Sequence, residues 1–216
     1  MNPRKALESD LVVLTPDSTF RDVVEVLLER PKSLGIRPIS ATVFRHARHD
    51  PGCLLEGADF LRRYLPTHAR ALVVFDRAGC GREDLPAVEL EQLVGESLCR
   101  VGWEGRAKAI VLDPELEVWA WSESPEVERC LGWVGRQPPL REWLRQKGMW
   151  EAGSAKPKDP KAATRLALFE ARKGAAPPAL LQIARSVSPR RCTDRAFVRF
   201  RGILQRWFPT EQRQEE

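Results

Sequence analysis

The stretch RALVVFD at residues 70–76 decides the fold class, because it is the clearest strand in the chain. Its five consecutive apolar residues are typical of a strand that is buried on both faces. It ends at Asp76, and a glycine-rich turn, RAGCGRED, follows at 77–84. The amphipathic segment at 87–103 then predicts a helix, and RAKAIVLD at 106–113 predicts another strand. A strand, a helix and a strand of these lengths indicate a parallel pair joined by a crossover helix.

The chain before this stretch repeats the same alternation. LVVL at 11–14 predicts a buried strand, and the spacing of apolar residues at 21–31 predicts a helix, which Asp17 or Ser18 would cap. A second strand is expected within 36–46 and a second helix within 56–65. Strands alternating with helices predict a parallel sheet that is covered on both faces. We therefore expect a parallel-sheet α/β core over residues 1–122.

The character of the chain changes after Pro114. Five helical segments, separated by Pro, Gly and Ser, are expected at 124–133, 138–150, 159–173, 177–187 and 190–208. We predict an all-helical, basic extension over residues 123–208 and a frayed tail at 209–216.

Charge is spread unevenly along the chain. Residues 145–216 carry 16 Lys and Arg against 7 Asp and Glu, a net charge of +9, whereas the rest carries 19 against 23. A basic surface of this kind favours polyanions, although arginine-rich helices are often only solvated faces. No run of about 18 apolar residues is present, so we expect no membrane span. Five scattered cysteines without a CxxC pair and the lack of an apolar signal core predict a cytoplasmic protein.

Several acids follow predicted strands, at the end of a parallel sheet where ligands usually bind. Asp17 follows the first strand, Asp50 follows the second, Asp76 ends the third, and Asp113, Glu115 and Glu117 follow the fourth. Such acids could share a hard cation such as Mg²⁺, which takes oxygen ligands and leaves room for phosphate. The structural alternative makes Asp17 and Asp113 helix caps and Asp76 a turn former.

The segment LDPELEVW at 112–119 distinguishes among these acids. Asp113 and Pro114 are typical of a helix start, and Glu115 in the first turn would suit the helix dipole. Glu117 has no such explanation, so we expect it to belong to a site. We expect the neighbouring tryptophans to pack beside it rather than to stack on bases.

Basic residues at two places suggest phosphate contacts. Lys156, Lys158 and Lys161 lie in KPKDPK, where Asp159 and Pro160 predict a helix start. Lys161 would lie in the first turn of that helix, where a cation opposes the helix dipole, so its position favours a function such as phosphate contact. The alternative is that the three lysines lie in a solvated linker.

Two loops give weaker evidence of phosphate binding. In FRHARHDPG, Arg45 and Arg48 fit a phosphate-facing loop better than His46 and His49 fit a zinc pair. The turn RAGCG could form a backbone anion nest, a weak signal because it lacks the lysine of a P-loop.

Taken in order, LVVLTPDST, LVVFDRAG, PELEVWAWS and KPKDPK resemble the TOPRIM-like proteins of bacterial anti-phage defence loci. Within these, the chain is most similar to a small component of the methylation-associated defence system. The resemblance spans about residues 10–208, and the last two motifs are its most specific part.

The resemblance implies a glutamate after the first strand as general acid and base, and an Asp-x-Asp motif after the third strand that holds Mg²⁺. Here Pro16 leaves the first strand and the acid is Asp17, while Ala78 replaces the second acid of the motif. Asp17, Asp76 and Glu117 are then the expected catalytic and metal-binding residues.

Two functions remain open from the sequence. The first is a defence protein that engages nucleic acid through this acidic site, with Mg²⁺-dependent phosphodiester cleavage as its chemistry. The second is a non-catalytic recognition or assembly subunit, bound to other proteins of the same defence system, in which the acidic site is degenerate. The chain has seven tryptophans, which could serve a partner surface but more commonly pack in a core.

Overall fold

The computed structural model describes residues 9–210 and has an α/β fold built on a four-stranded sheet. The strands are β1 (Ser9–Thr15), β2 (Ala41–Arg45), β3 (His68–Asp76) and β4 (Ala107–Leu112), in the order β2-β1-β3-β4. Every neighbouring pair is parallel. The predicted α/β fold with a parallel sheet is therefore confirmed.

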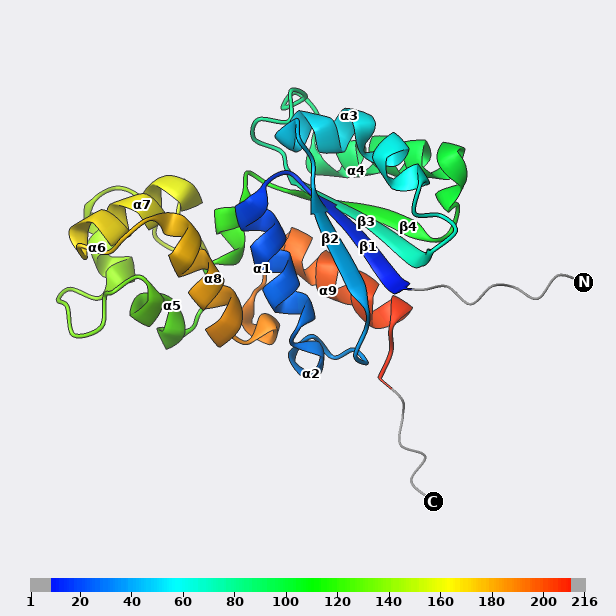
Figure 1. Cartoon of the computed structure of the whole chain (residues 1–216). Coiled ribbons are helices and arrows are strands. Elements are labelled where there is room, and N and C mark those ends of the chain that lie inside the picture. The colour runs from blue at the N-terminus through cyan, green and yellow to red at the C-terminus, as the bar shows by residue number, and fades with distance from the viewer. Residues whose placement is uncertain (1–8, 211–216) are drawn as a thin grey trace, which may run out of the picture.

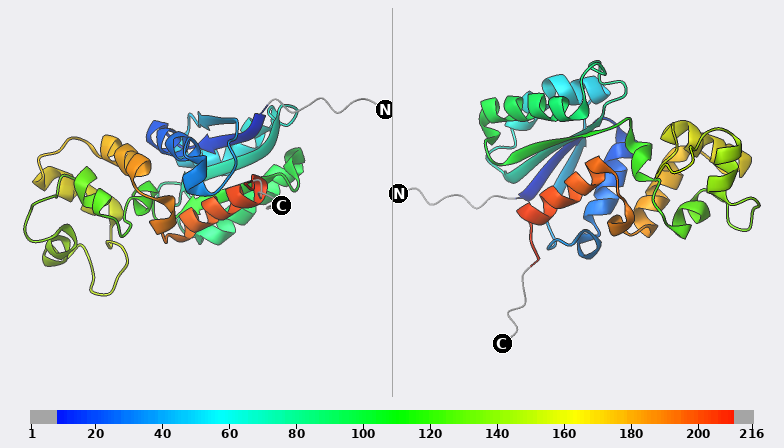
Figure 2. Two further views of the ribbon diagram at one scale, coloured as in Figure 1. Left: turned by 90° about the horizontal axis from the view of Figure 1, so that it is seen from below. Right: turned by 180° about the vertical axis from the view of Figure 1, so that it is seen from behind.

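Helices cover both faces of the sheet, because its central strands are apolar on both sides. Helices α3 (His49–Arg62) and α4 (Ala87–Leu98) lie on one face, and α1 (Ser18–Leu28) and α9 (Arg195–Trp207) lie on the other (Figures 1 and 2). Side chains alternate along a strand, so Val12 of β1 faces α3 and α4 while Val13 faces the opposite core.

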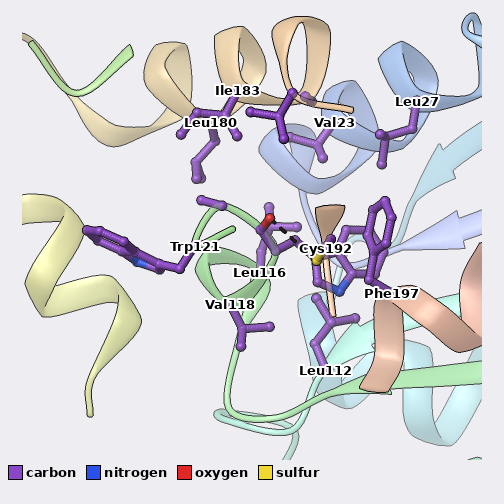
Figure 3. Packing of buried hydrophobic residues seen from close by; sticks show 14 of the residues in the cluster. Val23, Leu27, Leu112, Leu116, Val118, Trp121, Leu180, Ile183, Cys192 and Phe197 are labelled. Atoms are coloured by element: carbon purple, nitrogen blue, oxygen red, sulfur yellow. Dashed lines mark hydrogen bonds between the residues drawn. The ribbon is translucent and has the colours of Figure 1, made fainter. Parts of the chain in front are cut away.

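The chain after β4 is helical, as expected. Helices α5 (Pro125–Cys130), α6 (Leu140–Gln146), α7 (Pro160–Glu170) and α8 (Ala176–Ser186) form a group beyond the carboxyl ends of the strands (Figure 1). Helix α8 packs against α1, with Leu180 and Ile183 facing Val23 (Figure 3).

One hydrophobic core runs from a face of the sheet into this helical group. The boundary predicted at residue 122 stays a prediction. Residues 211–216 of the predicted frayed tail lie outside the described residues, whereas Pro209 forms an isolated bridge with Ile36. The short helix α2 (Pro31–Leu34) lies just before Ile36.

Two of the three predicted helix starts are confirmed. The Asp17 carboxylate accepts the Phe20 N–H at the start of α1, and Asp159 does the same for Ala162 at the start of α7. The start predicted at Asp113 is wrong. The Asp113–Pro114 peptide is cis, the Asp113 carboxylate pairs with Arg77 at 2.8 Å, and a short 3₁₀ helix begins at Leu116.

The tryptophans pack inside the protein, which is their commoner use. Six of the seven are buried, among them Trp119 and Trp121 beside Glu117. The expectation that these two pack rather than stack on bases is confirmed in this structure. All five cysteines lie in the described part and are free thiols. No helix between residues 9 and 210 is both long and apolar enough to cross a membrane.

An ion pair between a buried glutamate and two half-exposed arginines joins helices on opposite faces of the sheet across the edge strand β4. Glu91 of α4, with a side chain only 3% exposed, pairs with Arg195 at 2.9 Å and with Arg199 at 3.1 Å, both on α9. Its carboxylate also accepts the Val111 N–H of β4 at 3.1 Å. We call this contact the Glu91 clamp, because it holds α9, α4 and β4 together.

Candidate functional site

Two acids reach the carboxyl end of the sheet side by side, because β1 and β3 are neighbours. Asp76 is the last residue of β3, and Asp17 follows β1 as the cap of α1. The Asp17 Oδ1 is used by its cap bond to Phe20, at 2.8 Å. Asp17 therefore has a structural role, and its second oxygen adds negative charge at this end of the sheet.

Asp76 carries the most perturbed carboxylate of this region. Its Oδ1 is shielded from solvent and has no hydrogen-bond partner within the described chain. Burial holds the pKa of Asp76 well above its usual value, and the charge of Asp50 raises it further. A backbone hydrogen bond from Leu116 acts in the opposite direction. A carboxylate held this way is typical of functional sites rather than of stable cores.

Glu117 also lies at this end of the sheet, as expected of a site residue. It sits in the 3₁₀ helix Leu116–Trp119 and is only 7% exposed. Burial raises the pKa of the Glu117 carboxyl, and the charge of Glu115 adds to this, whereas Lys161 and Arg165 lower it. Glu117 therefore lies between like charges and a pair of cations.

These residues line one pocket of about 400 Å³, which we call the acidic pocket. Asp17, Asp76 and Glu117 contribute the acids, and Lys161 and Arg165 of α7 contribute positive charge. Thr19, Leu116 and apolar residues of α8 and its cap form the rest of its lining. The three acids predicted from the sequence thus reach a single pocket, and their roles there stay predictions.

The acidic pocket fits an oxygen-binding cation in its chemistry but not in its arrangement. Its three acids offer carboxylate oxygens, and one buried oxygen of Asp76 has no hydrogen-bond partner in the described chain. Both features suit a hard cation. However, within residues 9–210 no three His, Cys, Asp or Glu side chains are arranged so that they could hold a metal ion. A cation would have to draw these carboxylates closer together.

Sequence reasoning underrated two acids of this region. Asp50 lies in the first turn of α3, and its Oδ1 accepts the Asp76 N–H at 2.9 Å. Glu115, which was explained as a helix-start residue, instead pairs with Lys161 at 2.5 Å. The sequence signal that could identify Asp50 as a site residue is its position soon after the second predicted strand. The role of Glu115 could not be read from the sequence, because it depends on where α7 packs.

The predicted phosphate-binding lysines differ in their surroundings. Lys156 donates to the Val118 carbonyl at 2.8 Å and pairs with Asp194 at 3.0 Å, so its charge is used within the fold. Lys161 lines the acidic pocket, paired with Glu115. Lys158 is exposed and makes no side-chain hydrogen bond or ion pair with any described residue. Phosphate contact stays a prediction for all three lysines.

The two arginines that were expected to contact phosphate in the loop after β2 do not line the acidic pocket. Arg45 is exposed, and Arg48 pairs with Glu56, which also lies 3.6 Å from the Nε2 of the buried His46. Phosphate contact by Arg45 and Arg48 likewise stays a prediction. His49 lies in the first turn of α3, and the two histidines belong to no group of metal ligands in the described chain.

The glycine-rich turn after β3 already holds an anion of its own. The N–H groups of Gly79 and Gly81 donate to the Glu83 carboxylate at 2.8 and 3.2 Å. A hydrogen bond from its own amide lowers the pKa of Glu83, and the bonds from Gly81 and Gly79 lower it further. An external phosphate would have to displace Glu83, so this turn is a poor candidate for a phosphate site.

Asp50 gives the pocket region a testable pH dependence. Burial raises the pKa of Asp50 from 3.8 to about 6, so the folded state binds this proton more tightly than the unfolded state. The free energy of unfolding therefore falls as pH rises from about 4 to 6, and the loss is complete above that range. After allowance for solvent screening we expect the loss to be about 1–2 kcal/mol.

We expect Asp50→Asn to remove this loss while keeping an acceptor for the Asp76 N–H. Urea unfolding of both proteins at pH 4 and at pH 7 checks this. The variant should gain stability relative to the wild type at pH 7 but not at pH 4. Equal differences at both pH values would show that Asp50 titrates normally.

Comparison with protein-family models, with curated proteins and with solved structures finds no match to this chain. What the chain does must therefore be inferred from its own residues. The acidic pocket is the place where charged side chains from four separate segments meet: the β1–α1 turn, the end of β3, the 3₁₀ helix and α7.

Proposed function

We propose that this chain engages nucleic acid at the acidic pocket, as a TOPRIM-like anti-phage defence protein. One observation carries the proposal: Asp17 and Asp76 leave neighbouring parallel strands and share a pocket with Glu117 and two cations of α7. The resemblance read from the sequence implies acids at the ends of the first and third strands. The sheet order supports it, because it makes these two strands neighbours.

The two cations give the pocket a side that suits phosphate. Lys161 and Arg165 lie on the same face of α7, four residues apart, and both line the pocket. Arg165 is exposed and forms no hydrogen bond or ion pair with the described residues. Its planar guanidinium can therefore form two parallel hydrogen bonds to a phosphate without breaking an internal contact.

Magnesium is the cofactor that the proposal names. Asp76 and Glu117, with the remaining oxygen of Asp17, would hold it once they moved closer together than in this structure, and the ion would supply positive charge for binding a phosphate. The protein's own contribution is the shielded oxygen of Asp76, together with Lys161 and Arg165, which would position the phosphate beside it.

A second candidate function is a non-catalytic subunit of a multi-protein defence complex. It is favoured by Ala78, which stands where the resemblance implies a second acid, and by the missing three-ligand group in the described chain. Cleavage of DNA or RNA in Mg²⁺ or Mn²⁺ by the purified chain, abolished by Asp76→Ala, would favour the nuclease. Binding without cleavage, together with co-purification of other proteins from the same locus, would favour the subunit.

We expect Arg165→Glu to weaken nucleic-acid binding about tenfold at low salt, because it replaces an unpaired phosphate contact with a repelling charge. Fluorescence anisotropy with a labelled oligonucleotide measures the affinity. Arg62→Glu is the matched control, since Arg62 is an exposed arginine at the far end of α3. An equal loss in both variants would mean that only the net charge of the protein matters.

A further inference from the structure

Helix α7 carries a row of side chains that leads away from the acidic pocket. Lys161, Arg165 and Phe169 are spaced by four residues, so they lie on one face of the helix, and we call them the α7 row. They line a second pocket of about 450 Å³. The two pockets share Lys161 and Arg165, so the row continues the acidic pocket along the surface of α7.

Phe169 is exposed in a way that packing does not explain. It is 80% exposed, the highest fraction among the large hydrophobic side chains exposed in the described chain. Its neighbours Ala167 and Leu168 are buried, so the core of α7 is complete without it. Phe169 lies one turn from Arg165 and two turns from Lys161, and exposed rings in line with cations are typical of surfaces that bind single-stranded nucleic acids.

The net positive charge around the α7 row favours binding of a polyanion. Residues 156–173 contain six Lys and Arg against two Asp and Glu. Lys156 and Lys161 are compensated by internal acids, whereas Lys158 and Arg165 form no ion pair with any described residue. The one acid at the start of α7, Asp159, is used as the helix cap.

We infer that the α7 row binds single-stranded nucleic acid, with its backbone on Lys161 and Arg165 and an unpaired base stacked on Phe169. This inference rests on the proposed function and adds the class of nucleic acid. A ring on a helix surface can stack only on a base that is not covered by its neighbours in a duplex, so Phe169 selects single strands.

The test compares a labelled single-stranded oligonucleotide with a duplex of the same sequence by fluorescence anisotropy. Phe169→Ala should weaken single-strand binding about tenfold and leave duplex binding unchanged, because only a single strand offers a base to stack. Phe169→Trp should retain single-strand binding, and Phe169→Leu, which keeps the apolar surface but not the ring, should lose it. Leu55→Ala is the matched control, since Leu55 is 67% exposed on α3.

The outcomes separate this inference from the proposed function. If the wild type binds duplex and single strand equally and Phe169→Ala changes neither, the inference is overturned and the proposed function stands. If the wild type binds neither nucleic acid, both are overturned. Because Phe169 is exposed, its variants should unfold at the same temperature as the wild type, which circular dichroism verifies.

Discussion

Replacing Asp76 with Asn is expected to increase the free energy of unfolding at pH 7 by about 1–3 kcal/mol. Most substitutions of this kind destabilise a protein, but Asp76 holds a carboxylate with an unpartnered, shielded oxygen beside other acids. The amide of Asn has no charge to bury, and it still accepts the Leu116 N–H. Urea denaturation measures the change.

The pH dependence of this gain follows from the pKa of Asp76. Because that pKa is raised in the folded state, the carboxyl group lowers stability increasingly as pH rises above 3.8. The advantage of Asp76→Asn should therefore grow from acidic to neutral pH. Asp84→Asn is a suitable control, since Asp84 is 64% exposed and pairs with Arg82 on the surface; we expect it to leave the stability almost unchanged.

The same variant tests whether the pocket holds a cation. Mg²⁺ or Mn²⁺ should raise the unfolding temperature of the wild type and leave that of Asp76→Asn unchanged, because a ligand stabilises only the state that binds it. A destabilised Asp76→Asn protein would contradict the account of Asp76 as a buried carboxylate whose charge lowers stability at neutral pH. An equal response of both proteins to the cation would show that Asp76 does not bind it.

The Glu91 clamp is expected to give the largest loss of stability. Replacing Arg195 and Arg199 together with Ala leaves the Glu91 carboxylate without a cationic partner; because both arginines are nearly half exposed and their loss admits water, we expect a cost of about 2–3 kcal/mol. Each arginine alone should cost less, because the other still pairs with Glu91. Circular dichroism and urea unfolding measure the effect on the whole fold.

Glu91→Gln separates charge from hydrogen bonding in this clamp. The amide oxygen can still accept the Val111 N–H, so we expect a smaller loss of about 1–2 kcal/mol. Glu126→Ala removes the exposed ion pair with Arg129 and should leave the stability almost unchanged. A double arginine variant as stable as this control would mean that α9 is held by its apolar face alone.

The sequence predicted those parts of the fold that depend on local patterns. The short, β-branched apolar runs of β1, β3 and β4 are typical of buried strands, and the cap residues Asp17 and Asp159 act within three residues of themselves. The strand order could not be read locally. It is nevertheless what brings Asp17 beside Asp76.

The rest of the site depends on contacts between distant segments. Glu115 and Lys161 are 46 residues apart, and Lys156 meets Asp194 because both its own segment and the segment after α8 contact the 3₁₀ helix Leu116–Trp119. The sequence therefore does not show which basic residues are free to bind a ligand. In the fold, Lys156 pairs with Asp194, whereas Arg165 forms no ion pair with any described residue. Asp113 and Pro114 matched a helix start, but Arg77 takes the carboxylate that would have served as the cap.

Photo-crosslinking with an iodouracil-substituted single strand tests the central claim most directly, because it locates bound nucleic acid on the chain. Aromatic side chains that stack on the base react, and mass spectrometry identifies the linked peptide. The account predicts crosslinks within α7, at Phe169, that disappear in Phe169→Ala and weaken in Arg165→Glu. Crosslinks confined to α9 or to the loop after β2 would contradict a binding site at the acidic pocket and the α7 row.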